Sequence, residues 1–552
     1  MRWRALLEEI YGVEAADEVA GRFAAILDDF ALDHPLPPEE LSERDSWLIT
    51  YPDQFRDGRR RPLEVLGEFL DVHTKGWMTG VHVLPFYPWS SDDGFSIVDY
   101  LEVASDYGRW DDIARLSLSR RLMVDVVVNH MSASAEWFQR FLADDPRFAG
   151  FFRTADPDAD LSETVRPRTT SLLTRFGDRW VWTTFSEDQV DLDYANPEVL
   201  AAMLEVVLAY VRHGASVLRL DAVGFLWKEE GTSSIHHPKT HAIVQFFRAC
   251  LDAVAPGTVL VTETNVPHEE NVAYFGDARR PEAHLVYQFP LAPLVLDAVV
   301  RGDTSALAGW AAGLDTPVPG TAFLNFLASH DGVGLRPVEG LLDDGHVTAL
   351  ADLSRAVGGG VGERTLPGGN VVPYELNSTW FDLVGHGYDE DTAVRRHLAT
   401  HAVMFALAGV PLVYVHSLFG SSNDRAAFRS TGRIRSLNRR KFDSLGDLTE
   451  RLSDMATREA RVFSGIREMI VARSQLPAFA PTAPQVVTAP APGCVVIERG
   501  SGAGRAVVVV NLSDRAVGCG LPEGRWASVL GPHPSGGTIE LDAWSSAWLS
   551  GV

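Results

Sequence analysis

The chain has 552 residues, a formal net charge of −25, and 46% hydrophobic and 22% charged residues. This length allows a large core with appended domains, and the composition is typical of a globular protein. The acidic balance disfavours nucleic acid and anionic membranes as partners, because both need a basic surface. A small anionic substrate remains compatible, since a few arginines can form a local positive pocket.

Three cysteines, Cys250, Cys494 and Cys519, are widely spaced and form no metal-like pattern. They predict free thiols in a reducing compartment. The N-terminal stretch lacks the apolar core of a signal peptide, and no apolar run approaches the roughly 20 residues that span a bilayer. We therefore expect a cytoplasmic protein.

Residues 1–42 predict a helical extension that ends in the Pro-rich DHPLPPEE. After it, apolar runs alternate with amphipathic stretches such as 196–215 and 239–256, where apolar residues recur at helical spacing. Eight runs predict strands: WLITYP (47–52), VHVLPFYP (81–88), LMVDVVVNH (122–130), SVLRLDAVGF (216–225), TVLVTETN (258–265), HLVYQF (284–289), FLNFLASHD (323–331) and PLVYVHSLF (411–419). Continuously apolar strands are typical of parallel sheets covered on both faces. The pattern predicts a (β/α)8 TIM barrel, with a doubly wound open sheet as the alternative.

The expected catalytic barrel covers 43–483 and is interrupted by insertions at 131–190 and 332–395. Both follow predicted strands at the end where a barrel builds its site, so we expect them to cover that site. From 484 to 552, short β-like runs are separated by Gly and Pro. They predict a small antiparallel, sandwich-like β domain.

Polar residues follow four of the predicted strands, and a barrel would gather them at one mouth. They are Asp125, Asn129, His130, Arg219, Asp221, Glu263, His330 and Asp331. Three carboxylates suit a retaining glycosidase reaction, which needs a nucleophile and an acid/base, with a third group to stabilise charge. For Asp125 a structural role, as a satisfied buried polar group, is an equal alternative.

Residues i and i+2 of a strand share a face, so we expect Arg219 beside Asp221, lowering the pKa of that nucleophile. Glu263 would need a raised pKa to donate a proton. Carboxyl groups of Asp221 and Glu263 about 5–5.5 Å apart would make the reaction retaining.

The segments VDVVVNH, VLRLDAVGF, TETN and FLASHD resemble the four conserved regions of glycoside hydrolase family 13, the α-amylase clan. The resemblance implies that Asp221 is the nucleophile, Glu263 the acid/base and Asp331 the transition-state stabiliser. It also implies a glucose-binding role for three further residues: His130, Arg219 and His330. No metal or cofactor is expected, since carboxylates do the proton and nucleophile work.

RLDAVGFLWKEEGTSSIH, PFYPWSSDDGFS and SASAEWF resemble the sucrose phosphorylase subfamily. That subfamily's glucose-pocket residues fall here on Asp92, Phe95, Gln189 and Arg439. RPRTTSLLT resembles a loop that supplies an arginine to phosphate, which points to Arg168. Arg168 and Arg439 could each instead form a surface or structural ion pair.

TETNVPHEENVAYFGD, GSSNDRAAF and VVPYELN resemble glucosylglycerate phosphorylases. The resemblance implies reversible phosphorolysis of 2-O-α-glucosylglycerate to α-glucose 1-phosphate and glycerate, through a covalent β-glucosyl-Asp intermediate. The alternatives are a phosphorylase of glucosylglycerol, sucrose 6'-phosphate or sucrose, an α-glucosidase or transglucosidase, and a non-enzymatic relative. The expected partners are the glucoside, phosphate and a hydroxy-acid or polyol acceptor, and the expected assembly is a monomer or homodimer.

Overall fold

The computed structural model describes residues 2–32, 35–37, 40–168, 170–315, 318–365 and 370–552. Its centre is a closed barrel of eight parallel strands in the order β1-β15-β11-β10-β9-β8-β3-β2. The strands are β1 (Trp47–Thr50), β2 (Gly80–Val83), β3 (Arg121–Val127), β8 (Val217–Asp221), β9 (Val259–Thr262), β10 (Leu285–Tyr287), β11 (Ala322–Asn325) and β15 (Val410–Tyr414). Each predicted run contains or overlaps one of them, so the barrel prediction is confirmed and the open sheet is excluded.

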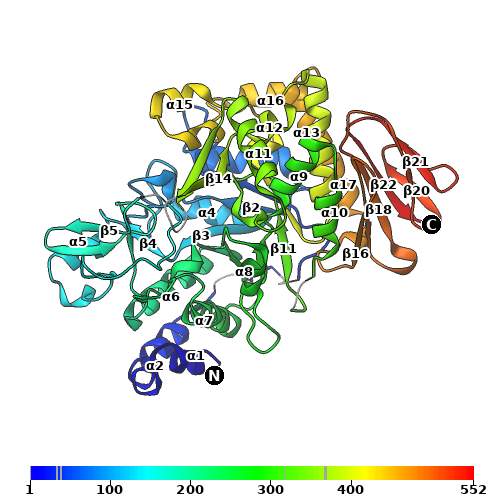
Figure 1. Ribbon diagram of the computed structural model, residues 1–552. Helices are drawn as coiled ribbons and strands as arrows, with labels where there is room; N and C mark the ends of the chain where they lie inside the picture. The colour runs from blue at the N-terminus through cyan, green and yellow to red at the C-terminus, as the bar shows by residue number, and fades with distance from the viewer. Residues whose placement is uncertain (1, 33–34, 38–39, 169, 316–317, 366–369) are drawn as a thin grey trace.

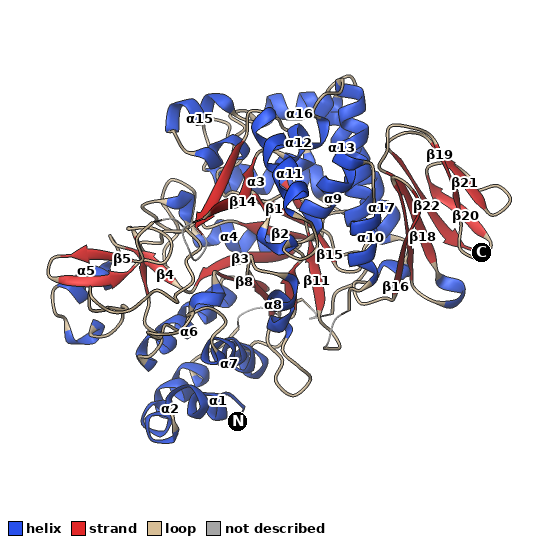
Figure 2. Ribbon diagram, in the orientation of Figure 1, coloured by secondary structure: helices blue, strands red, loops and turns tan. Residues whose placement is uncertain are grey.

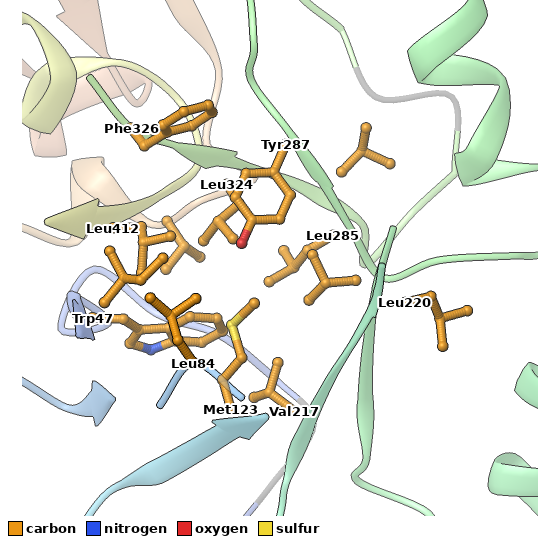
Figure 3. Packing of buried hydrophobic residues seen from close by; sticks show 14 of the residues in the cluster. Trp47, Leu84, Met123, Val217, Leu220, Leu285, Tyr287, Leu324, Phe326 and Leu412 are labelled. Carbon is orange, nitrogen blue, oxygen red and sulfur yellow. The ribbon is translucent and has the colours of Figure 1, made fainter. Parts of the chain in front are cut away.

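The barrel interior is filled by side chains from several strands. Trp47, Met123, Val217 and Leu285 are each at most 1% exposed and turn toward one another there (Figure 3). A Cβ on Gly80 would lie 2.4 Å from the Trp47 ring, so only glycine allows this indole between β1 and β2. Complete burial explains why these strands are apolar along their whole length.

Helices form a layer outside the strands (Figure 2). Those that follow barrel strands include α3 (Pro62–Phe69), α4 (Trp110–Ser117), α6 (Pro197–Arg212), α7 (Pro238–Val254), α8 (His268–Val272), α9 (Leu291–Arg301), α10 (Ser305–Ala312), α13 (Glu390–Ala406), α14 (Val415–Leu418), α15 (Arg425–Thr431), α16 (Leu445–Ser453) and α17 (Arg458–Ser474). Asn196 caps α6 by accepting a hydrogen bond from the Glu198 amide, with Pro197 in the first turn. Asn followed by Pro is a sequence-level start signal for a helix.

Both expected insertions carry small sheets of their own. The first contains β4 (His130–Ser132), α5 (Glu136–Leu142), β5 (Leu173–Phe176), β6 (Arg179–Trp182) and β7 (Gln189–Asp191). The second contains β12 (Val333–Gly334), α11 (Asp344–Ala356), β13 (Gly360–Thr365), β14 (Val371–Asn377) and α12 (Trp380–Gly385), and part of its Gly-rich segment, 366–369, lies outside the described residues. β4 pairs with β7, and β14 pairs with β12 and β13, which ties each insertion to the barrel mouth.

At the N-terminal end of the chain, α1 (Arg2–Tyr11) and α2 (Val13–Asp28) pack on α7 and α6 (Figure 1). Phe23 meets Phe246 edge-on, with ring centroids 5.2 Å apart. Residues 33–34 and 38–39 of the DHPLPPEE segment lie outside the described residues.

The C-terminal segment forms the predicted antiparallel β structure (Figure 1). One sheet has the order β16-β17-β18-β22-β20 and a second pairs β19 with β21. Their bounds are β16 (Gln485–Ala491), β17 (Cys494–Arg499), β18 (Ala506–Asn511), β19 (Val517–Gly520), β20 (Trp526–Leu530), β21 (Thr538–Leu541) and β22 (Ser545–Gly551). Val507, Val509 and Ile539 form the apolar layer between the two sheets.

The prediction of three free thiols was wrong. A disulfide joins Cys494 of β17 to Cys519 of β19, and Cys250 is free and buried. The pairing brings together two sheets, and a separation of 25 residues along the chain gives no sign of it. The cysteines therefore no longer support a reducing compartment. In the described part of the chain, no helix is long and apolar enough to cross a membrane.

Candidate active site

A cavity opens where β3, β8, β9 and β11 end. It holds about 680 Å³ including its open mouth, within the size range of small-molecule sites. Nine of the predicted site residues line it: Asp92, Phe95, His130, Arg168, Gln189, Asp221, Glu263, His330 and Asp331. The other two, Arg219 and Arg439, lie directly behind the cavity wall and contact residues that line it.

Arg219 contacts the predicted nucleophile, Asp221, from behind the cavity wall, as the i, i+2 spacing indicated. Its Nη1 donates to Asp221 Oδ1 at 2.6 Å and to Asp125 Oδ1 at 2.5 Å. Asp125 is fully buried and also contacts His82 Nε2 at 2.8 Å. Asp125 therefore anchors Arg219 from outside the cavity, which is the structural alternative considered for it.

Glu263 follows β9 and faces the same space as Asp221. Its Oε2 accepts a hydrogen bond from the Ala222 amide at 3.1 Å and lies 4.0 Å from Arg219 Nη2. Burial raises the pKa of Glu263 above its ordinary value, while Arg219 opposes the shift and Asp331 adds to it. This direction agrees with the requirement for a proton donor.

Burial also raises the pKa of Asp221, although Arg219 opposes the shift; the charge of Glu263 adds to it. The expectation that Arg219 would lower the pKa of Asp221 was wrong in net direction. One guanidinium is shared among three carboxylates, and it cannot offset both their burial and their mutual repulsion.

Asp331 has the opposite environment. Burial would raise the pKa of Asp331, but Arg435, His330 and Arg439 outweigh it and hold that pKa far below the ordinary value. Arg435 Nη1 lies 2.6 Å from Asp331 Oδ1, and Arg435 Nη2 donates to Glu375 Oε2 at 2.9 Å. Asp331 is therefore a fixed negative charge.

The imidazoles and the amide of the cavity form a neutral polar wall. Gln189 Nε2 lies 3.1 Å from His130 Nε2 and donates to Asp92 Oδ2 at 3.2 Å. Burial lowers the pKa of His130 to about 4 and that of His330 to about 3, so both rings are neutral near pH 7. Phe95 stacks on His330 with ring centroids 5.0 Å apart. Neutral groups of this kind can hydrogen-bond sugar hydroxyls.

Asp92 and Asp93 both adopt left-handed backbone, with φ of 53° and 49°. The Nη1 of Arg439 is bonded to Asp93, and its Nε donates to the His330 carbonyl at 2.9 Å. Non-glycine residues in this region are strained and need support from their surroundings. Arg439 therefore fixes the loop that presents Asp92 to the cavity.

Arg168 comes from the first insertion and lines the cavity. No hydrogen bond or ion pair among the described residues holds its guanidinium. Beside three carboxylates, it is a positive charge available to an anion.

Sequence reasoning missed several cavity residues. They are Pro167, Phe185, Ala222, Asn265, Phe289, Ser329, Gly332, Tyr374, Glu375 and Arg435. Asn265 lies in the TETN motif and Arg435 directly precedes SLNRR, so proximity to a motif was a usable signal for these two. Tyr374 and Glu375 come from β14, and their contacts depend on how the second insertion folds. Among the described residues, no cluster of His, Cys, Asp and Glu could hold a metal ion.

A closed (β/α)8 barrel whose mouth gathers three carboxylates around a polar cavity has the architecture of a glycoside-transforming enzyme. Residues 50–311 match the family model of the alpha-amylase catalytic domain, and the chain belongs to this family. The family predicted from the four motifs is thereby confirmed.

Two relatives resemble the chain along nearly all of its length. It is 46% identical over 546 residues to glucosylglycerate phosphorylase of Allomeiothermus silvanus, covering 96% of this chain and 97% of the relative. It is 45% identical to glucosylglycerate phosphorylase of Spirochaeta thermophila, covering 96% and 92%. The crystal structure of sucrose 6F-phosphate phosphorylase from Thermoanaerobacter thermosaccharolyticum superposes with a TM-score of 0.74 at 24% identity, covering 85% of this chain and 94% of that one, which supports the fold.

Proposed function

We propose that the chain is a retaining α-glucoside phosphorylase that converts 2-O-α-glucosylglycerate and phosphate to α-glucose 1-phosphate and glycerate, reversibly. The near full-length similarity to two glucosylglycerate phosphorylases carries this proposal. The cavity supports it independently, because three carboxylates and Arg168 line one space.

In the first half-reaction, an Asp221 oxygen attacks the anomeric carbon and the glycosidic bond breaks. Glu263 gives its proton to the departing glycerate oxygen, and a β-glucosyl-Asp221 ester forms. Burial raises the pKa of both Asp221 and Glu263, which favours one proton held within the pair. Arg219 is 2.6 Å from Asp221 and 4.0 Å from Glu263, so the proton resides on Glu263 and the charge on Asp221.

In the second half-reaction, a phosphate oxygen attacks the anomeric carbon and Asp221 leaves as carboxylate. Glu263, now ionised, takes the proton of the attacking group. Two inversions give α-glucose 1-phosphate with net retention. Asp331 stabilises the positive charge that develops on the sugar, since Arg435 keeps it ionised. Arg168 gives phosphate an advantage over water.

The glucosyl ring is bound by side chains that line the cavity: Asp92, Phe95, His130, Gln189 and His330. In this assignment Arg219 and Arg439 act from behind the cavity surface, through Asp221 and through Asp93 with the His330 carbonyl. The substrates are the small glucoside, phosphate and the acceptor; phosphate is a substrate, and no cofactor takes part.

The domain division at 42 and 483, the state as monomer or homodimer and the cytoplasmic location remain part of the proposal. Size-exclusion chromatography with light scattering tests the assembly, and fractionation of the native host tests the location.

The test of function is synthesis from α-glucose 1-phosphate with glycerate, glycerol, fructose 6-phosphate or fructose as acceptor. We expect glycerate to give the highest kcat/KM. Free glucose formed at the same rate with and without phosphate would instead identify a glucosidase. A preference for another acceptor would retain the phosphorylase mechanism and reject glycerate. An α-configured glucose 1-phosphate product, read by NMR, tests retention.

A further inference from the structure

A second cavity adjoins the glucose cavity on the far side of Glu263. It holds about 420 Å³ including its mouth. The two cavities share part of their walls: Pro167, Phe185, Ala222, Glu263, Asn265 and Tyr374. Glu263 protonates the departing oxygen, so the group bonded to that oxygen extends into this second cavity, which we call the acceptor cavity.

Arg336 lines the acceptor cavity and is not part of the glucose cavity wall. It begins the short 3-10 helix Arg336–Val338, which follows β12. A Cβ on Gly334 would lie 2.6 Å from Asn265 Oδ1, so glycine is needed for β12 to lie this close to the loop after β9. This close approach places a cation of the second insertion beside the acid/base loop.

The guanidinium of Arg336 is only partly satisfied. Its Nη2 lies 3.5 Å from Glu270 Oε2, and the buried Nε has no hydrogen-bond partner within the described residues. The same Glu270 oxygen is 3.1 Å from His236 Nε2. Glu270 is 42% exposed, whereas the Arg336 side chain is 15% exposed. A mostly buried arginine with a long contact and a free donor is poised for another anion.

Arg168 and Arg336 are both close enough to Tyr374 to act on its pKa. Burial raises the pKa of Tyr374 to about 12, and the two arginines oppose that shift. Tyr374 remains a neutral hydroxyl, and it lines both cavities. These two cations near Tyr374 therefore line different cavities: Arg168 the glucose cavity and Arg336 the acceptor cavity.

We propose that Arg336 is the residue that recognises the carboxylate of the acceptor, while Arg168 serves phosphate. This inference rests on the proposed function. In a glucosylated 2-hydroxy acid, the carboxylate is bonded to the carbon that carries the departing oxygen, so it enters the acceptor cavity beyond Glu263. A guanidinium fork matches carboxylate geometry. Phosphate has no carboxylate extending from the reacting oxygen, because that oxygen is bonded directly to phosphorus. Phosphate therefore stays nearer the glucose cavity.

The other residues of the acceptor cavity limit the size and charge of the group attached to the 2-hydroxy acid. Phe225, Ile235 and Val266 form an apolar side, and Thr264, Asn265 and His236 a polar one. Burial, with His241 and Arg336, lowers the pKa of His236 to about 4, so it is neutral near pH 7 and adds no second charge. The substrate class is a short 2-hydroxy acid with one carboxylate.

A series of four acceptors tests the assignment in the synthetic direction. Glycerate and lactate carry the carboxylate; glycerol and propane-1,2-diol are their neutral counterparts. Arg336→Gln should reduce kcat/KM for both acids by roughly 10- to 100-fold, the usual cost of removing a hydrogen-bonded charge, and reduce it far less for both neutral acceptors. Arg336→Lys should recover part of the loss for the acids.

Glu270→Gln is the matched variant, because it removes the charge that competes for Arg336 and leaves the guanidinium in place. It should lower KM for glycerate by about two- to fivefold, the scale of a half-exposed ion pair, without the same effect on glycerol. An unchanged or higher KM for glycerate would contradict the proposal.

Isotope exchange between glucose 1-phosphate and phosphate distinguishes the role of Arg168 from that of Arg336, because the exchange needs no acceptor. Arg336→Gln should affect this exchange much less than glycerate transfer, whereas Arg168→Gln should impair the exchange strongly. Equal losses for acids and neutral acceptors, or a larger loss in exchange, would overturn the assignment of Arg336. If the unaltered protein prefers a neutral acceptor, the proposed function itself fails, and that result is visible before any variant is made.

Discussion

Replacing Arg435 by glutamine tests the electrostatic account of the site most directly. Arg435 contacts Asp331 at 2.6 Å and Glu375 at 2.9 Å, and its side chain is 17% exposed. Glu375 is 4% exposed and also accepts a hydrogen bond from the Gly332 amide at 3.1 Å. The substitution leaves both carboxylates in place and removes the cation between them.

The expected loss of unfolding free energy is about 3 kcal/mol. Breaking a buried pair by removing one partner costs roughly 3–5 kcal/mol, and the lower end applies because the Asp331 side chain is 30% exposed to the cavity. Asp331 would also lose its fixed ionisation and orientation. We expect kcat to fall by about 10²- to 10³-fold, as when one preorganised electrostatic partner is removed from a reacting centre.

The stability difference should depend on pH. The folded pKa of Asp331 lies below its ordinary value of 3.8, so its contribution is fully present above that value and is lost as the pH falls through the lower, folded pKa. Urea unfolding at neutral pH and at a pH well below 3.8 should therefore give a larger difference between variant and unaltered protein at neutral pH.

Two further variants make the result decisive. Arg429→Gln, in exposed α15, is the matched control and should change neither quantity. Arg435→Gln combined with Glu375→Gln should regain stability, because one unpaired buried charge is gone, but should not regain kcat. If Arg435→Gln kept the kcat of the Arg429 control, the role assigned to Arg435 in holding Asp331 would be refuted.

Four other outcomes follow from the structure. Asp221→Ala should abolish turnover with every acceptor while the protein stays folded, which activity assays and circular dichroism check; retained phosphorolysis would reject the nucleophile. Glu263→Gln should slow glucosides far more than glucosyl fluoride, whose leaving group needs little protonation. In the unaltered enzyme, kcat/KM should fall as the pH rises through the raised pKa of Glu263, above its ordinary 4.5, because the donated proton is then missing; a profile unaffected by Glu263→Gln would contradict this. Arg473→Met should lower the unfolding free energy by several kcal/mol, about 3 or more, and leave KM unchanged, because the buried Arg473 donates to five backbone carbonyls far from the cavity; thermal unfolding and kinetics measure the two effects.

The first-insertion arginine shows the limit of motif reasoning. Resemblance of a loop indicated Arg168, and the structure brings it to the cavity without an ion pair among the described residues. The same reasoning placed Arg439 against glucose, whereas the structure places it behind the wall, bonded to Asp93 and the His330 carbonyl. Both lie near a motif, and only packing decides which one faces the substrate.

The sequence determined the barrel and its trio of carboxylates, because both follow from short-range patterns. A buried parallel strand is apolar along its length, and the closed topology brings the ends of such strands to one rim. Asp221, Glu263 and Asp331 could be identified as site candidates from their place at or beyond the C-terminal end of a strand. Residues i and i+2 on β8 likewise fixed the contact of Arg219 with Asp221.

Tertiary structure alone decided the net direction of the Asp221 pKa, the Arg435 clamp, the Cys494–Cys519 pairing and the position of Arg336 in the acceptor cavity. Each depends on the distances between segments that are remote in sequence, and these distances are set when the insertions and the C-terminal sheets pack. Burial and electrostatic coupling vary steeply with such distances, and a one-dimensional pattern does not contain them.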